Sequence, residues 1–210
     1  MINRSILIML LSLAVTLSIA QDPWDQWDAD VLRELNTASE VNYLNAEEKK
    51  LILIMNMARH DGPLFVKTLL ADYVEEKQVD NNSYLRSLRK DLNNVRGLIP
   101  LQPQKDLTAA ALGHAIKSGR TGRVGHQDFN KRFDPLVGNP YNHVGENCSY
   151  GYETAMDIVI SLLIDEGVKD HGHRKNILSL SFNSVGVAIR PHKSYRINCV
   201  MDFGRRPVSQ

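Results

Sequence analysis

Residues 185–203 read VGVAIRPHKSYRINCVMDF. This stretch holds two short apolar runs, 185–189 and 197–203, and each has the length and character of a β-strand. Pro191 and Ser194 stand between the runs and are typical of a turn. The pattern predicts an antiparallel hairpin near the end of the chain.

The chain before this hairpin is dominated by helical patterns. Asn45 followed three residues later by Glu48 makes a capping box, which predicts the start of a helix. Further helices are predicted over 64–74 and 84–95, and Asp106 can cap a fourth. Helices early and strands late predict an α+β fold. The apolar residues at helical spacing in the first helix are Leu51, Ile54, Met55 and Ala58.

The first twenty residues have the order of a signal peptide. Arg4 precedes an apolar stretch from Ile6 to Leu17, and the small-residue site Ser18-Ile19-Ala20 follows. The stretch is shorter than the roughly 20 residues of a transmembrane helix, and no later segment is apolar enough to span a bilayer. We expect cleavage after Ala20 and a mature protein without a transmembrane segment, secreted or periplasmic.

Charge and length narrow the class of protein. The chain has 25 basic and 24 acidic residues, whereas a nucleic-acid-binding protein would need a clear basic excess. We therefore expect no nucleic-acid partner. Acidic residues gather between 22 and 48 around Trp24 and Trp27, an arrangement that indicates a solvated lead-in segment. The chain that remains after cleavage is long enough for a single domain with one core.

The two cysteines are Cys148 and Cys199. No pair has the spacing of a zinc knuckle or a redox CxxC motif. In an oxidising compartment an even cysteine count favours a structural disulfide between them over two free thiols. A cysteine nucleophile is a further alternative, which an intact disulfide would exclude.

Several polar residues in turn-rich places could carry chemistry. The chain has no HExxH, no GxSxG elbow, no Gly-rich phosphate loop and no EF-hand loop. Two histidines and two carboxylates would suit a divalent metal such as zinc, or general acid–base work. The alternative is that these side chains cap helices or lie on the surface. His114, on an alanine-rich helix face, we interpret instead as a buried, hydrogen-bonded core histidine. The candidates are His126, Glu146, Asp165, Glu166, His171 and His173.

Four short segments stand in a characteristic order along the chain: Gly125-His126, Gly145-Glu146-Asn147, Gly172-His173-Arg174 and Cys199-Val200-Met201-Asp202-Phe203. In order and relative placement they resemble the CAP superfamily, which contains cysteine-rich secretory proteins, antigen 5 and plant pathogenesis-related proteins. The resemblance covers about residues 44–204, between a lead-in over 21–43 and a tail over 205–210. It implies a three-layer α-β-α sandwich with a mainly antiparallel central sheet and a groove on one side.

The resemblance also implies a site. Family members often carry two histidines and two acidic residues in the groove, and some bind zinc or another divalent cation there. The matching positions are His126, Glu146 and His173, and the second acid is Asp165, with Glu166 next in line. His171 is the alternate for the second histidine. The short path from Asp165 to His173 and the low cysteine count resemble the shorter, bacterial-type version of the domain.

CAP domains have been linked to sterol and lipid binding, to proposed peptidase activity, and to signalling or host interaction. We rank a binding role first, because the sequence shows no activated Ser or Cys nucleophile and no motif for a water-activating metal. The ligand is expected to be extracellular: a lipid, a peptide or a cell-surface component. The alternatives are a metal-assisted hydrolase with Glu146 as general base, and a structural or host-interaction module in which the four residues brace the fold.

Overall fold

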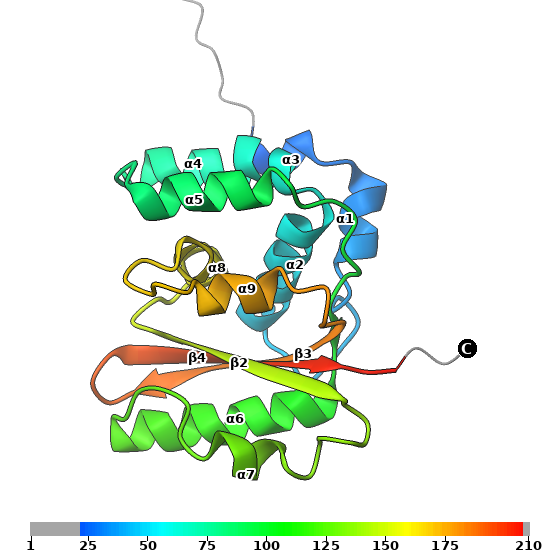
Figure 1. Ribbon diagram of the computed structural model, residues 1–210, viewed down its shortest axis with the longest axis vertical. Coiled ribbons are helices and arrows are strands. Elements are labelled where there is room, and N and C mark those ends of the chain that lie inside the picture. The colour runs from blue at the N-terminus through cyan, green and yellow to red at the C-terminus, as the bar shows by residue number, and fades with distance from the viewer. Residues whose placement is uncertain (1–21, 208–210) are drawn as a thin grey trace, which may run out of the picture.

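The computed structural model describes residues 22–207, so the predicted signal peptide lies outside the described residues. Within that range a four-stranded sheet lies between two groups of helices (Figure 1), which confirms the predicted α+β sandwich. No helix among residues 22–207 is both long enough and apolar enough to cross a membrane.

The sheet has the strand order β1-β3-β4-β2. The antiparallel β3–β4 ladder is the predicted hairpin, β2 adds to β4 antiparallel, and β1 pairs with β3 in parallel over two residues. The sheet is therefore mixed but mainly antiparallel, and β2 is an edge strand. The strands are β1 (Gln102–Pro103), β2 (His143–Tyr150), β3 (Ser184–His192) and β4 (Arg196–Arg205).

One face of the sheet is covered by α6 (Lys105–Thr121) and the short α7 (Phe129–Phe133), as Figure 1 shows below the strands. The contact between α6 and the sheet is close because the facing residues are small. A Cβ at Gly186 of β3 would lie 2.1 Å from the backbone of Leu107 in α6. The buried apolar residues of this layer are Ala111, Ala115, Cys148, Ala188 and Val200.

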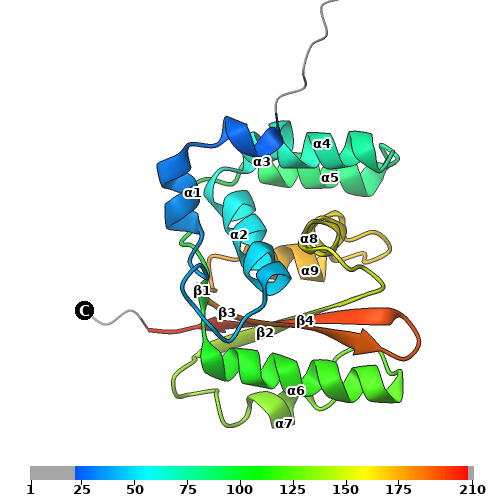
Figure 2. The ribbon, with the colours of Figure 1, turned by 180° about the vertical axis from the view of Figure 1, so that it is seen from behind.

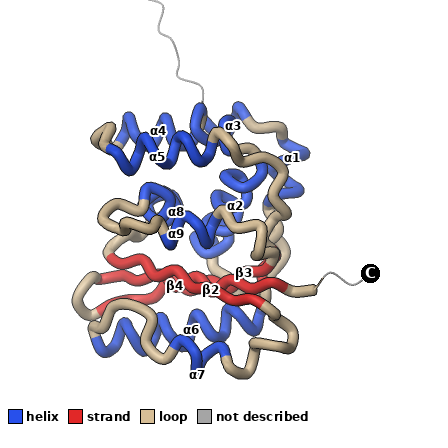
Figure 3. Tube along the Cα trace, in the orientation of Figure 1, coloured by secondary structure: helices blue, strands red, loops and turns tan. Residues whose placement is uncertain are grey.

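The other face carries the larger core and two tiers of helices. Figures 1 and 2 show α2, α8 and α9 next to the sheet and α3, α4 and α5 beyond them, while the colours of Figure 3 separate the strands from both helical groups. The outer tier is an addition to the expected three layers. The helices of this side are α1 (Ala29–Leu35), α2 (Ala46–His60), α3 (Gly62–Lys67), α4 (Leu69–Glu76), α5 (Ser83–Leu92), α8 (Ala155–Ile164) and α9 (Gly172–Ile177), with a 3₁₀ turn, η1 (Pro23–Gln26).

The start of α2 follows the sequence prediction. The Asn45 side chain accepts the Glu48 N–H at 2.9 Å, and the Glu48 carboxylate accepts the Asn45 N–H at 2.9 Å, which completes the capping box. The four apolar residues predicted at helical spacing are all fully buried. Periodicity and capping together were sufficient to predict this helix.

The segment before α2 is more firmly packed than its acidic composition indicates. Trp27 is 5% exposed, and its indole Nε1 donates to Thr68 Oγ1 at 3.0 Å. Leu35, at the end of α1, is also buried. The interpretation of this stretch as solvated was therefore wrong at these positions, because the apolar residues between the acids pack against the helical core.

The predicted disulfide is also wrong, since Cys148 and Cys199 are both free and buried. Cys148 of β2 is opposite Val200 of β4, one residue along from Cys199. Successive side chains of a strand point to opposite faces of the sheet. Cys148 therefore lies in the α6 layer and Cys199 in the main core, and their thiols cannot meet.

Candidate functional site

Glu146 is the centre of the first polar cluster. It lies on the edge strand β2, and its side chain is fully buried on the sheet face that α6 covers. His126, from the loop between α6 and α7, approaches with Nδ1 at 2.8 Å from Oε1 of Glu146. An ionised carboxylate only accepts, so Nδ1 carries the proton and donates. The His126 ring is 48% exposed.

Arg132, which the sequence analysis did not single out, is a second partner of Glu146. Its Nη2 donates to Glu146 Oε1 at 3.0 Å, and Nη1 lies 2.6 Å from Oε2. Asp202 is directly across the ladder on β4, fully buried, and 3.9 Å from Arg132 Nη1. One arginine therefore faces two buried carboxyl groups.

The two carboxyl groups respond oppositely to this environment. Burial raises the pKa of Glu146, but hydrogen bonds from His126 and Arg132 and the charge of Arg132 outweigh burial, and its pKa lies well below the usual range. Burial and the negative charge of Glu146 raise the pKa of Asp202 well above the usual range. Glu146 is therefore the carboxyl group of the cluster that ionises first as the pH rises, and Asp202 is the one that keeps its proton longer.

Asp165 and His173 form the second pair. Asp165 ends α8 in a left-handed conformation with φ of 58°, and His173 stands in the first turn of α9. The Asp165 Oδ1 accepts from His173 Nδ1 at 2.7 Å, and Oδ2 accepts the backbone N–H groups of His173 and Arg174. Burial raises the pKa of Asp165, but these hydrogen bonds outweigh it and the pKa is lowered.

The two pairs lie on opposite sides of β2. Glu146 points to the α6 face, and its neighbour Asn147 points to the other face, where its Nδ2 donates to the carbonyl of His173 at 3.0 Å. The consecutive Glu146 and Asn147 thus connect β2 to both histidine segments. The structure thus brings the four predicted residues together as two pairs, His126 with Glu146 and Asp165 with His173.

The alternate residues have other partners. The Glu166 carboxylate accepts from Asn82 Nδ2 at 3.0 Å, in the turn before α5. The His171 ring contacts Tyr84 edge to face at 5.7 Å, and its buried Nδ1 has no hydrogen-bond partner among the described residues. The structure thus pairs His173 with Asp165 and directs both alternates toward the outer helical tier.

A cavity of about 380 Å³ opens beside the second pair, between β2 and α8. Asp165, Glu166 and His173 line its polar side, whereas His126 and Glu146 are not part of the lining. Aliphatic side chains from α8, from the loop after it and from the turn after α4, with Cys148 and Ser149 of β2, complete the wall. The tyrosines of the lining are Tyr73, Tyr150 and Tyr152.

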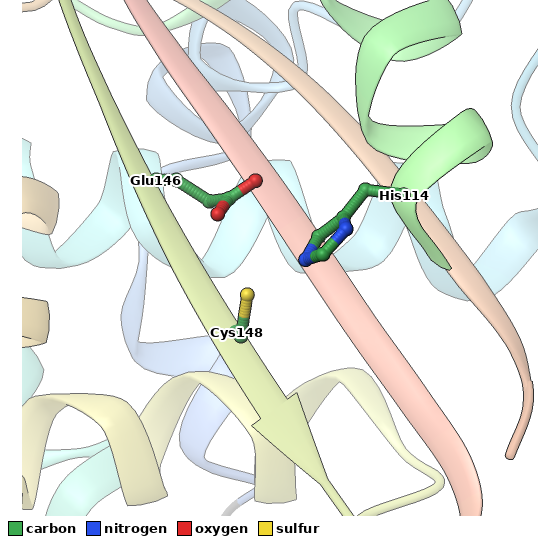
Figure 4. Close-up of side chains that lie close together, drawn as sticks. All are labelled: His114, Glu146 and Cys148. Atoms are coloured by element: carbon green, nitrogen blue, oxygen red, sulfur yellow. The ribbon is translucent and has the colours of Figure 1, made fainter. Parts of the chain in front are cut away.

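A third group lies beneath β2. His114, Glu146 and Cys148 each offer a metal-ligand atom, and these atoms lie within 4.8 Å of one another; Figure 4 shows the side chains pointing together. Each is already engaged, however. His114 Nε2 lies 2.9 Å from the carbonyl of Gly125, Glu146 is held by its two cationic partners, and burial and the charge of Glu146 raise the pKa of the Cys148 thiol.

We interpret this group as a buried polar network. The prediction that His114 is a buried, hydrogen-bonded core histidine is confirmed, since it is 1% exposed and contacts Gly125.

Sequence reasoning missed Arg132, Asp202 and the tyrosines. Arg132 lies in a turn-rich stretch with no periodicity, and only the tertiary fold brings it to Glu146. Asp202 was visible in the closing strand, where a charged residue within an apolar run is unusual. Its position opposite Glu146 depends on the ladder register, which the local pattern does not specify.

A mainly antiparallel sheet between helical layers, with histidine–carboxylate pairs on either side of an edge strand, defines an α-β-α sandwich with its candidate site at the sheet edge. The profile of the Cysteine-rich secretory protein family, abbreviated CAP, matches residues 79–203. The chain belongs to the CAP family. The matched range begins after α4, within the turn that precedes α5.

Solved structures with similar folds come from bacteria and a flatworm. Venom allergen-like protein 4 of Schistosoma mansoni has a TM-score of 0.50 and 11% identity, covering 79% of this chain and 92% of that chain, and it supports the fold. An outer surface protein of Borrelia burgdorferi has a TM-score of 0.44 and 20% identity, covering 61% and 97%.

An extracellular Bacillus anthracis protein containing an SCP domain has a TM-score of 0.43 and 22% identity, covering 52% of this chain. This chain spans only 35% of the Bacillus protein. A search of curated proteins found no match.

Proposed function

We propose that this chain is a secreted CAP-domain protein that binds a ligand in the cavity beside Asp165 and His173. The observation that carries the proposal is the composition of the cavity, which joins tyrosine and aliphatic side chains to the Asp165–His173 pair and Glu166. Ligand sites in proteins have this character, with volumes of roughly 300–1,000 Å³. Secretion is supported by the signal-peptide pattern of the first twenty residues and by the character of the family.

The size of the cavity favours a small ligand. At about 380 Å³ it lies near the lower end of the range for ligand sites. Its wall also mixes polar and apolar groups, whereas a site for a long acyl chain would need a continuous apolar lining. Among the expected ligands, a compact group with both polar and apolar surface fits better than a whole lipid.

The hydrolase alternative is less well supported by the geometry. A general base needs a pKa near the working pH and a free oxygen near the substrate. Glu146 has a lowered pKa, both of its oxygens contact Arg132 or His126, and it is not part of the cavity lining. These contacts favour binding over proton transfer at Glu146.

A divalent metal fits the histidines in one respect. Histidines that bind metal usually donate their other ring nitrogen to a carboxylate, which orients the ring. His126 and His173 both have Nδ1 on a carboxylate, which leaves Nε2 as the atom that would hold a metal such as zinc. A bound cation would supply positive charge for an anionic or carbonyl group of a ligand.

Calorimetric titration with zinc tests whether the two histidines hold a metal. We expect binding by the mature protein that His126→Ala and His173→Ala each weaken, while His60→Ala, at the end of α2, leaves it unchanged. Absence of binding at micromolar zinc would remove the metal from the proposal.

The binding proposal is tested by nuclear magnetic resonance of the isotopically labelled mature protein against a panel of small polar, apolar and charged compounds. We expect shift changes that cluster around the cavity for at least one compound. Tyr152→Ala should weaken that binding, because Tyr152 lines the cavity and is 44% exposed. Tyr43→Ala is the control, since Tyr43 lies outside the lining.

A result in which no compound perturbs the cavity would contradict the proposal. So would a His173→Ala variant that melts at a lower temperature but binds every compound as the wild type does. That outcome would favour the structural alternative, in which the four residues brace the fold.

A further inference from the structure

The aromatic side chains of the cavity favour one ligand chemistry. Tyr73 of α4 and Tyr152 of the turn after β2 line the same cavity. Tyr150 at the end of β2 also lines it, but its side chain packs in the α6 layer, where its hydroxyl accepts from the Gly125 N–H. Aromatic rings attract cations through the negative face of the π-system, most strongly where water is excluded. Tyr73 is only 8% exposed, so part of this wall is desolvated.

The charges of the lining also favour a cationic ligand. Asp165 and Glu166 are both in the wall, and no lysine or arginine among the described residues lines it. His173 is the one basic group of the lining, and Asp165 already holds its Nδ1. An anionic ligand would meet carboxylates without a matching cation, whereas a cationic ligand meets complementary charge.

Three of the four carboxylate oxygens in the wall already accept hydrogen bonds, which favours a cation that needs no acceptor. The Asp165 oxygens accept from His173 and Arg174, and Glu166 Oε1 accepts from Asn82. A primary ammonium carries three N–H donors that need acceptors. A quaternary ammonium group carries none and is held by rings and by net charge alone.

We propose, on the basis of the binding function above, that the cavity takes a quaternary ammonium group. The group belongs either to a free small molecule or to a lipid headgroup, and the rest of the ligand lies outside the cavity. The rings of Tyr73 and Tyr152 contact the cation, and Asp165 and Glu166 supply the opposing charge.

Calorimetry with choline and 3,3-dimethylbutan-1-ol tests the proposal, because the two molecules have the same shape and only choline is charged. We expect choline to bind the mature protein at least about tenfold more tightly, which corresponds to about 1.4 kcal/mol. Ethanolamine, with a primary ammonium, should bind more weakly than choline. Equal affinity for choline and its neutral analogue would overturn the proposal.

Matched variants test whether choline binds in the cavity. Glu166→Gln and Tyr152→Leu should each weaken choline binding several-fold. Glu153→Gln and Tyr43→Leu remove the same charge and the same ring from positions outside the cavity lining and should leave binding unchanged. If the control pair weakens choline as much as the cavity pair, the cation binds elsewhere and the proposal fails.

Two further measurements distinguish a lipid headgroup from a free small molecule, and failure of this inference from failure of the proposed binding function. Sedimentation with phosphatidylcholine vesicles supports a lipid headgroup, and binding of choline without vesicle association supports a free ligand. If neutral panel compounds perturb the cavity and choline does not, the inference fails while the binding function stands. If no compound perturbs the cavity, both fail.

Discussion

Glu146 is ionised inside the protein because Arg132 and His126 face it. Removing one partner of a buried ion pair leaves the other charge uncompensated, which costs about 3–5 kcal/mol. We therefore expect Glu146→Gln to lower the free energy of unfolding by an amount of that order in urea denaturation at pH 7. The exposed Glu153→Gln is the control, and a loss no larger than the control's would contradict this view of the cluster.

Asp202 should behave in the opposite way, although it lies directly across the ladder from Glu146. Its folded-state pKa is raised by burial and by Glu146, so ionisation in the unfolded chain lowers stability as the pH rises above about 4. Asp202→Asn removes that loss. We expect the variant to be at least as stable as the wild type at pH 7, with an advantage that disappears below pH 4. Lower stability at pH 7 would show that Asp202 is ionised in the fold.

The contribution of Asp165 to stability also depends on pH. Its folded-state pKa is lowered because the hydrogen bonds from His173 and Arg174 outweigh the effect of burial. Its stabilisation is therefore complete above the unfolded pKa of about 4 and is lost as the pH falls through the lower folded value. Thermal melts of wild type and Asp165→Asn should differ most at neutral pH and converge in acid. Curves that stay parallel throughout would contradict the assignment.

Helix α6 and strand β3 approach so closely that one glycine limits their spacing. A Cβ at Gly186 would lie 2.1 Å from backbone atoms of Leu107 and Thr108, which cannot move without shifting the helix. We expect Gly186→Ala to destabilise the protein by about 1–3 kcal/mol or more. Gly113→Ala within α6 is the control, because no atom lies within 4 Å of its added Cβ and alanine favours a helix by up to about 1 kcal/mol. Denaturant unfolding of both variants should give changes of opposite sign.

The elements differ in how far local sequence predicts them. Helix α2 has a capping box and a regular apolar face, and hairpin β3–β4 has two apolar runs, so both were predictable. Strand β2 was not predicted as a strand, because Glu146, Asn147 and Ser149 interrupt any apolar alternation. Their burial depends on partners that lie far away in the sequence, including His126, Arg132 and Asn176.

The candidate site, too, was predictable from the sequence only in part. The candidate residues were found in sequence through glycine-flanked histidines and the GEN segment, and the structure places them as two pairs. The pairing, the participation of Arg132 and the tyrosine wall all depend on which strand edges and helix ends meet, and local patterns do not contain that information.

At the scale of the whole molecule, the two cysteines of the described residues are free thiols in separate layers of the core. Cys148 and Cys199 are 7% and 1% exposed and lie on opposite faces of the sheet. We expect reductant to leave the unfolding midpoint unchanged, and alkylating reagent to modify both thiols only after denaturant is added. A mass lower by two hydrogens that reductant restores would contradict the strand register.

The cavity is formed by parts of the fold that are far apart in the sequence. It lies where the sheet edge, α8 and the outer helical tier meet, so three separate parts of the fold must be in place before it exists. The ligand site is therefore a property of the assembled layers.

A crystal structure of the mature protein with the tightest-binding compound of the panel is the most direct test of this account. The account predicts that the compound lies in the cavity between β2 and α8, in contact with Tyr152 and within reach of His173. A compound bound elsewhere, with the cavity empty, would contradict it.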